Sequence, residues 1–124
     1  MTQSHNSRRE AGRRGEEAAA SFLVEQGYAI LQRNWRCRSG ELDIIAEEQG
    51  TLVFVEVRSR RQGGAFGTPE ESVDWRKQKK VRETAQVYLH LTRQWERSVR
   101  FDLVAVRTGS DGEIAGMTLL RHAF

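Results

Sequence analysis

The chain has 124 residues but only one cysteine, Cys37. A single cysteine excludes an internal disulfide bond and a zinc site built from cysteines. The three histidines, His5, His90 and His122, are scattered along the chain. No pair of them has the helical spacing of metal ligands, which argues against a histidine-based zinc site.

Long hydrophobic runs are also missing. No apolar segment approaches the roughly 20 residues that a helix needs to cross a membrane. The arginines near the N-terminus are not followed by the apolar segment of a secretory signal. We therefore expect a cytoplasmic protein that has no membrane partner.

Charged residues make up 30% of the chain and hydrophobic residues 38%, which is typical of a single globular domain over residues 1–124. The net charge is +3, and residues 1–15 carry it as four arginines against one glutamate. Basic clusters attract the phosphate backbone of nucleic acids, although a solvated helix face is the alternative interpretation. A second basic cluster consists of Arg76, Lys77, Lys79, Lys80 and Arg82.

The hydrophobic pattern predicts seven elements in the order αβββαββ, after a disordered segment at residues 1–7. Such an order favours an α/β (α+β) domain with a mixed β-sheet flanked by helices. The first helix should end at Gly27, and the second should start at Pro69 or Asp74. Residues 36–40 should form a basic loop, and residues 62–69 a glycine-rich connection or a substrate-contacting loop. The expected helices span residues 8–26 and 69 (or 74)–93, and the expected strands span 28–35, 98–107 and 114–122, with a hairpin at 41–60.

The hairpin register follows from a two-residue turn at Gln49-Gly50. In that register Asp43 pairs with Glu56, and Glu41 pairs with Arg58. Because side chains alternate between the two faces of a strand, these four residues share one face. The other face should pack in the core through Leu42, Ile44, Ala46, Val53, Val55 and Val57.

Asp43 and Glu56 interrupt two strands that are otherwise apolar, so each acid needs a partner. Directly opposed side chains have their Cβ atoms about 4.5–5.5 Å apart, close enough for both carboxylates to bind one cation. The alternative is a cross-strand ion network, with Glu41 next to Arg58, worth about 0–1 kcal/mol if exposed. The hairpin alone leaves both interpretations open.

Several segments together resemble the YraN-like family of small bacterial proteins. The resemblance implies a restriction-endonuclease-like core, similar to Holliday-junction resolvases, and a nuclease site of the PD-(D/E)xK type. The motifs that carry it are Gly15-Glu16, Arg33-Asn34-Trp35-Arg36, Gly40-Glu41-Leu42-Asp43-Ile44-Ile45-Ala46, Val53-Phe54-Val55-Glu56-Val57-Arg58-Ser59-Arg60, Pro69-Glu70 and Lys77.

The resemblance also implies roles for individual residues. Asp43 and Glu56 would be the two acids of the motif, and Glu16 would add a metal contact from the first helix. Arg58 occupies the position usually held by lysine. Arginine stays protonated and cannot act as a base, but it can orient water or stabilise charge on a phosphate. The implied cofactor is Mg²⁺ or Mn²⁺.

The expected activity is Mg²⁺-assisted hydrolysis of phosphodiester bonds in DNA. The side chains expected to hold the nucleic-acid backbone without reading its sequence are Arg60, Arg61, Arg76, Lys77 and Lys80. A non-catalytic nucleic-acid-binding module is the alternative, and a protein-interaction domain is a third hypothesis. By analogy with junction resolvases we also expect a homodimer.

Overall fold

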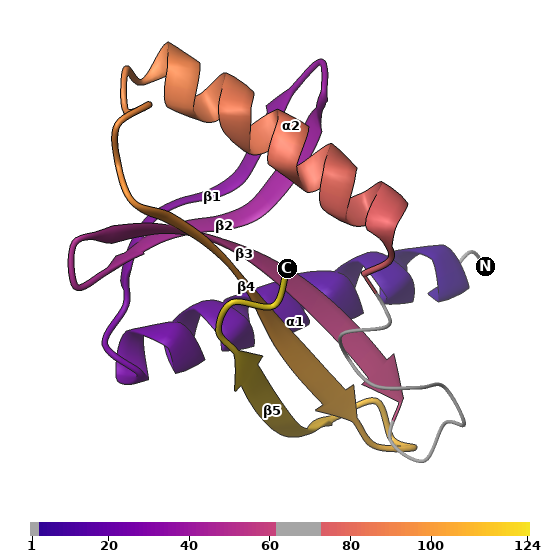
Figure 1. Cartoon of the computed structure of the whole chain (residues 1–124). Helices are drawn as coiled ribbons and strands as arrows, with labels where there is room; N and C mark the ends of the chain where they lie inside the picture. Colours follow the sequence, from indigo (N-terminus) through magenta and orange to yellow (C-terminus); the bar gives the residue numbers. More distant parts are fainter. Residues whose placement is uncertain (1–2, 62–72) are drawn as a thin grey trace.

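The computed structural model describes residues 3–61 and 73–124, with side chains from residue 12 onward (Figure 1). Its elements follow the predicted αβββαββ order. They are α1 (Gln3–Glu25), β1 (Ala29–Cys37), β2 (Gly40–Glu48), β3 (Thr51–Arg61), α2 (Trp75–Leu91), β4 (Val99–Thr108) and β5 (Ile114–Leu120).

The five strands form one sheet in the order β1-β2-β3-β4-β5. β3 and β4 are parallel, and α2 lies between them in the chain, whereas the other neighbouring strands are antiparallel. α1 and α2 cover opposite faces of this sheet (Figure 1). The prediction of a mixed sheet flanked by helices is therefore confirmed.

The helix ends are set by local signals. α1 begins at Gln3, earlier than predicted, and includes most of the segment expected to be disordered; Met1 and Thr2 lie outside the described residues. Gly27 follows α1 with φ 98°, as expected of a glycine that ends a helix. α2 begins after Asp74, whose carboxylate accepts the N–H of Lys77 at 3.0 Å. The alternative start at Pro69 and the glycine-rich segment 62–69 lie outside the described residues.

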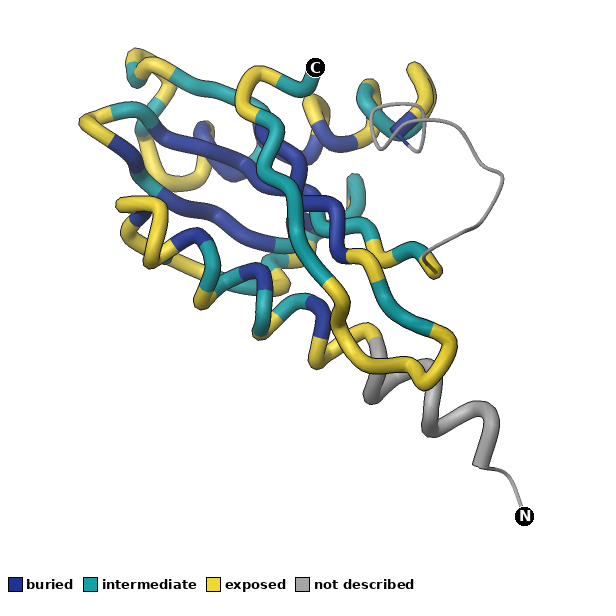
Figure 2. The backbone as a smooth tube through the Cα atoms, turned by 90° about the horizontal axis from the view of Figure 1, so that it is seen from below, coloured by how far each residue is buried: buried dark blue, intermediate teal, exposed yellow. Residues whose placement is uncertain are grey.

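The core has two layers, and burial is greatest along the central strands (Figure 2). Ala19 and Leu23 of α1 pack on one face of the sheet. The predicted apolar stripe of α2 is buried on the other face, and it consists of Val81, Ala85, Tyr88 and Leu89. Within the described residues neither helix is both long and apolar enough to span a membrane.

The predicted turn at Gln49-Gly50 is confirmed. Both residues have positive φ, 49° and 81°, and Glu48 pairs with Thr51. The predicted register continues along β2 and β3 as far as the pair Ile44–Val55. The predicted basic loop is shorter than expected, because β1 extends to Cys37 and pairs with β2 up to Gly40.

Beyond Ile44–Val55, β2 departs from the predicted geometry. The carboxylate of Asp43 accepts the backbone N–H of Val57 at 2.9 Å. Leu42 was expected on the same face as Ile44, but it packs beneath α2 with Ile45 instead. Two residues that are two apart on a regular strand would share a face, so the alternation is broken at Asp43.

The first residues of β2 pack against α2, and this contact explains why the alternation of side chains is broken at Asp43. A Cβ atom added at Gly40 would lie 3.0 Å from Oγ1 of Thr84. This close approach shows that the β1–β2 ribbon lies against the helix there. The same deviation moves Glu41 away from the predicted pairing with Arg58, and Glu41 instead pairs with Arg36 at 3.3 Å.

A buried polar network joins β2 to β4 and to the residues after β5. Asp102 is fully buried and accepts hydrogen bonds from Tyr28 Oη at 2.6 Å and from the Arg100 guanidinium at 2.9 Å. The Asp102 carboxylate therefore serves as a structural hydrogen-bond partner. Arg100 also donates to Glu48, and Arg121 donates to Glu48 at 2.6 Å. These two arginines lower the pKa of Glu48 to about 2.

We expect Glu48→Gln to remove stability that depends on pH. The ionised carboxylate is favoured in the folded chain, so its contribution is complete above the unfolded pKa and is lost as pH falls towards the folded pKa of about 2. Chemical denaturation at pH 7 should show a loss of about 2 kcal/mol, and the difference from wild type should shrink between about pH 4.5 and pH 2.

Glu47→Gln is the matched control, because Glu47 is the neighbouring acid, is more exposed and pairs with Arg97 alone among the described ion pairs. It should cost less than about 1 kcal/mol. A Glu48→Gln penalty that does not change with pH would contradict the assignment of the Glu48 network as a source of acid-sensitive stability.

Candidate metal centre

Three carboxylates converge where β2 breaks its alternation. Glu16 comes from α1, and Glu41 and Asp43 come from β2. One oxygen of each carboxylate lies within 4.8 Å of the other two. Oxygen donors are the ligands that hard divalent cations prefer. This acidic triad could therefore hold a metal ion.

The electrostatics of the triad favour a cation. Burial is the main cause that raises the pKa of Asp43, and the charge of Glu41 adds to it, whereas the N–H of Val57 and the charge of Lys77 oppose it. Burial also raises the pKa of Glu16, helped by the negative charges of Asp43 and Glu41. A bound cation would offset both the cost of burying these charges and the repulsion between them.

Glu56 lies in the same recess but has a different partner. Its side chain is only 2% exposed, and one carboxylate oxygen lies 3.2 Å from Nζ of Lys77. Burial and the charge of Asp43 raise the pKa of Glu56 to about 7, although Lys77 and Arg58 oppose the shift. The prediction that Glu56 is a metal ligand stays a prediction, and the geometric triad contains Glu41 instead.

The recess has a volume of about 760 Å³ and is open to solvent on one side. It mixes acids with four cationic side chains, so it suits an anion that arrives with a metal ion. Its lining consists of Gly12, Arg13, Glu16, Arg36, Asp43, Glu56, Val57, Arg58, Ser59 and Lys77. The predicted site residues Asp43, Glu56, Arg58 and Glu16 are therefore brought together.

Sequence reasoning missed Glu41, Arg13 and Arg36 as members of this site. Glu41 was visible in the motif segment, but the regular register pointed it towards Arg58. Arg36 belongs to the motif Arg33-Asn34-Trp35-Arg36, but neither its place in the recess nor that of Arg13 followed from the sequence, because both depend on how α1 and β1 pack.

The five predicted nucleic-acid contacts lie on β3 and on the first turns of α2. Lys77 lines the acidic recess. Arg60 and Arg61 line a neighbouring cavity. Arg76 lies over the ring of the exposed Trp75, 5.6 Å from its centroid, and Lys80 lies next to Gly40 at the β1–β2 turn. Their role in binding nucleic acid stays a prediction.

We expect Glu16→Gln to raise the melting temperature of the metal-free protein and to abolish stabilisation by Mn²⁺. The raised pKa means that the ionised carboxylate is disfavoured in the folded chain, so at neutral pH its charge costs stability. For wild type, Mn²⁺ at about ten times its Kd should add about 1.4 kcal/mol to the unfolding free energy.

Thermal unfolding with and without Mn²⁺ measures both effects. Glu17→Gln is the control, because Glu17 is an exposed acid on the same helix and is not part of the triad. It should leave the Mn²⁺ response unchanged. An equal Mn²⁺ response in wild type and Glu16→Gln would remove Glu16 from the metal centre.

Comparison with known proteins assigns this chain to a family. A family model described as "Uncharacterised protein family UPF0102" matches residues 15–106. A UPF0102 protein of Moorella thermoacetica is 46% identical over 117 residues, which cover 94% of this chain and 97% of the relative. One of Desulforamulus reducens is 45% identical, with 94% and 96% covered. One of Pseudomonas savastanoi pv. phaseolicola is 42% identical, with 96% of each chain covered. This chain therefore belongs to the UPF0102 family, which confirms the YraN-like resemblance of its motifs.

Proposed function

We propose that this protein is a metal-dependent nuclease that hydrolyses phosphodiester bonds in DNA. The observation that supports this function best is the cluster of Glu16, Glu41 and Asp43, two of which, Glu16 and Asp43, line a recess that also presents arginine and lysine side chains. Carboxylates to hold a divalent cation and cations to hold a phosphate are the two requirements of metal-assisted phosphodiester hydrolysis. The motif resemblance to PD-(D/E)xK nucleases points to the same reaction.

The residues in and beside the recess would have different roles. Asp43, Glu41 and Glu16 would hold Mg²⁺ or Mn²⁺, and such an ion would supply Lewis acidity that lowers the pKa of the attacking water. Arg58 faces the same recess and stabilises the charge that develops on the phosphate oxygens. Because a guanidinium keeps its proton, Arg58 does not act as the base.

Lys77 compensates for the arginine at position 58. Its Nζ lies 3.2 Å from a carboxylate oxygen of Glu56, which is almost fully buried. Its backbone N–H is held by the Asp74 carboxylate at the first turn of α2. Lys77 therefore brings a lysine ammonium into the site from the helix and would hold the carboxylate of Glu56 in place.

The alternative is a nucleic-acid-binding module that does not cleave. Arg58 in place of the motif lysine favours this second function, because the usual ionisable group is missing from β3. The cationic lining of the recess would serve binding equally well.

Incubation of the protein with Mg²⁺ or Mn²⁺ and labelled DNA tests the proposal. The substrates are a duplex, a single strand and a four-way junction. We expect cleavage that Asp43→Asn and Glu56→Gln each reduce by at least about a hundredfold, because the ligand and charge arrangement is lost. Salt-sensitive binding without cleavage of any substrate would favour the binding module, and absence of both would overturn both functions.

A second prediction concerns Lys77. We expect Lys77→Ala to lower kcat by about a hundredfold or more, as loss of a positioned group at the reacting centre does, with a smaller change in KM for DNA. Lys79→Ala is the control, since Lys79 is an exposed lysine on the same helix and lies outside the recess. Steady-state kinetics that put the two variants at the same kcat would reduce Lys77 to a general electrostatic contribution.

A further inference from the structure

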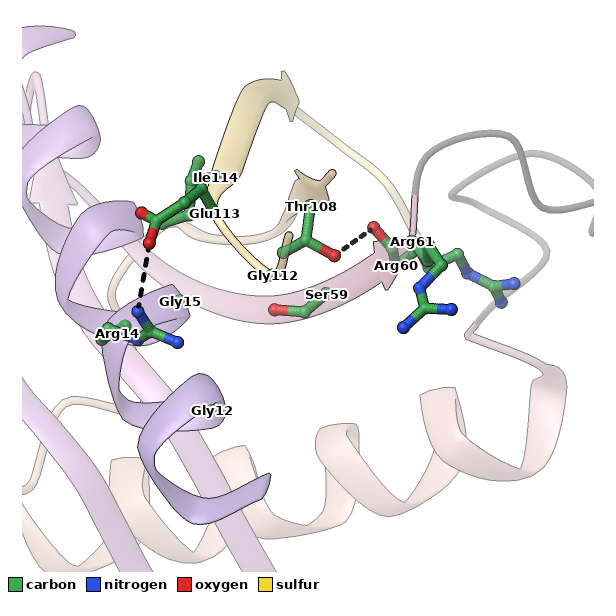
Figure 3. Close-up of a pocket in the computed structure, with 10 residues that line it drawn as sticks. All are labelled: Gly12, Arg14, Gly15, Ser59, Arg60, Arg61, Thr108, Gly112, Glu113 and Ile114. Atoms are coloured by element: carbon green, nitrogen blue, oxygen red, sulfur yellow. Dashed lines mark hydrogen bonds and ion pairs between the residues drawn. The ribbon is translucent and has the colours of Figure 1, made fainter. Parts of the chain in front are cut away.

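A second cavity adjoins the acidic recess (Figure 3). It has a volume of about 420 Å³ and lies between α1, the end of β3, β4 and the turn that leads into β5. Gly12 and Ser59 line both this cavity and the acidic recess. The two spaces are therefore neighbours that share these two small residues as lining.

The cavity has the chemistry of a nucleotide site. Ser59 and Thr108 bring hydroxyl groups, Ile114 brings an apolar surface, and Arg60 and Arg61 bring positive charge. Figure 3 shows the two arginines on one side of the cavity and the Arg14–Glu113 ion pair, 3.9 Å long, on the opposite side. A volume of about 420 Å³ falls in the range of small-molecule sites, so the cavity suits one nucleotide and not a base pair.

Gly12 supplies the decisive observation. It is an exposed glycine inside a helix, where glycine is less favourable than alanine. A Cβ atom added to Gly12 would meet no described atom within 4 Å, so packing does not require glycine there. Gly15 is different, because its Cβ would lie 2.7 Å from Ser59 Oγ and close packing explains it. Because Gly12 lines both spaces, its missing side chain leaves open the place where they adjoin.

We infer that the two spaces form one groove, and that the nucleotide next to the metal-bound phosphate enters the second cavity as an unpaired nucleotide. This inference rests on the proposed function for the position of the phosphate. A base can enter this cavity only after it has left the duplex stack, and mismatched or single-stranded bases leave the stack most easily. The preferred substrate is therefore DNA with at least one unpaired nucleotide beside the phosphate.

Binding measurements with fluorescein-labelled DNA test the groove without relying on cleavage. The probes are a blunt duplex and the same duplex with one unpaired nucleotide, in buffer with Ca²⁺. We expect wild type to bind the second probe about tenfold more tightly, and Gly12→Leu to lose that preference, because the leucine side chain occupies the place where the two spaces adjoin. Gly12→Ala should keep the preference and unfold at a higher temperature than wild type.

A second variant changes the wall of the cavity that β5 contributes. Ile114→Trp adds bulk at a lining residue on β5, away from the carboxylates, and should also remove the preference for the unpaired nucleotide. Glu17→Leu places the same leucine on an exposed position of α1 outside both spaces and should behave as wild type.

The outcomes separate this inference from the proposed function. Loss of the preference in Gly12→Leu and Ile114→Trp, with the Mn²⁺-induced shift in melting temperature retained, supports the groove. Equal binding of the two probes by wild type, or an unchanged preference in both variants, overturns it. If the protein prefers the unpaired nucleotide but never cleaves DNA, the groove is supported and the proposed nuclease function is contradicted.

Discussion

The hydrogen bond from the Val57 N–H to the Asp43 carboxylate is the contact on which the site depends. Backbone N–H groups in the interior need an acceptor, and here a side chain supplies it at the position where β2 leaves β3. The bond fixes the carboxylate relative to the main chain of β3. Asp43 therefore stays close to Glu41 and Glu16 although the three charges repel one another.

Two acids on β2, the buried Glu48 and the half-buried Asp43, have pKa values shifted in opposite directions. Glu48 receives hydrogen bonds from two arginines, and its pKa falls to about 2. Asp43, five residues earlier, accepts a backbone N–H, and burial together with the charge of Glu41 raises its pKa. A satisfied carboxylate stabilises the fold, whereas a carboxylate whose charge is not balanced marks a place for a ligand.

Local sequence signals were enough to predict most of the framework. The Gln49-Gly50 turn fixed the register of β2 and β3 as far as Ile44–Val55, and the helical spacing of Val81, Ala85, Tyr88 and Leu89 gave the buried face of α2. The break at Asp43 was not predictable from spacing, because it depends on contact between Gly40 and α2, more than 40 residues away in the chain. That break moved Leu42 to the other face and brought Glu41 into the triad. The hydrogen-bond partners of Glu48 were equally unpredictable, because Arg100 and Arg121 are distant from it in the sequence.

The start of α2 links the basic cluster to the site. With Asp74 as the cap, Lys77 lies in the first turn of the helix, where a positive charge is unfavourable because the helix dipole is positive at that end. The buried carboxylate of Glu56, 3.2 Å from Nζ, offsets this cost. A buried acid and a lysine in the first turn of a helix each cost stability. Together, Glu56 and Lys77 form an ion pair at the edge of the acidic recess. Two residues that are each unfavourable in their local setting, and that compensate each other at one recess, are expected of a functional site. A solvated basic helix face would not require such a pair.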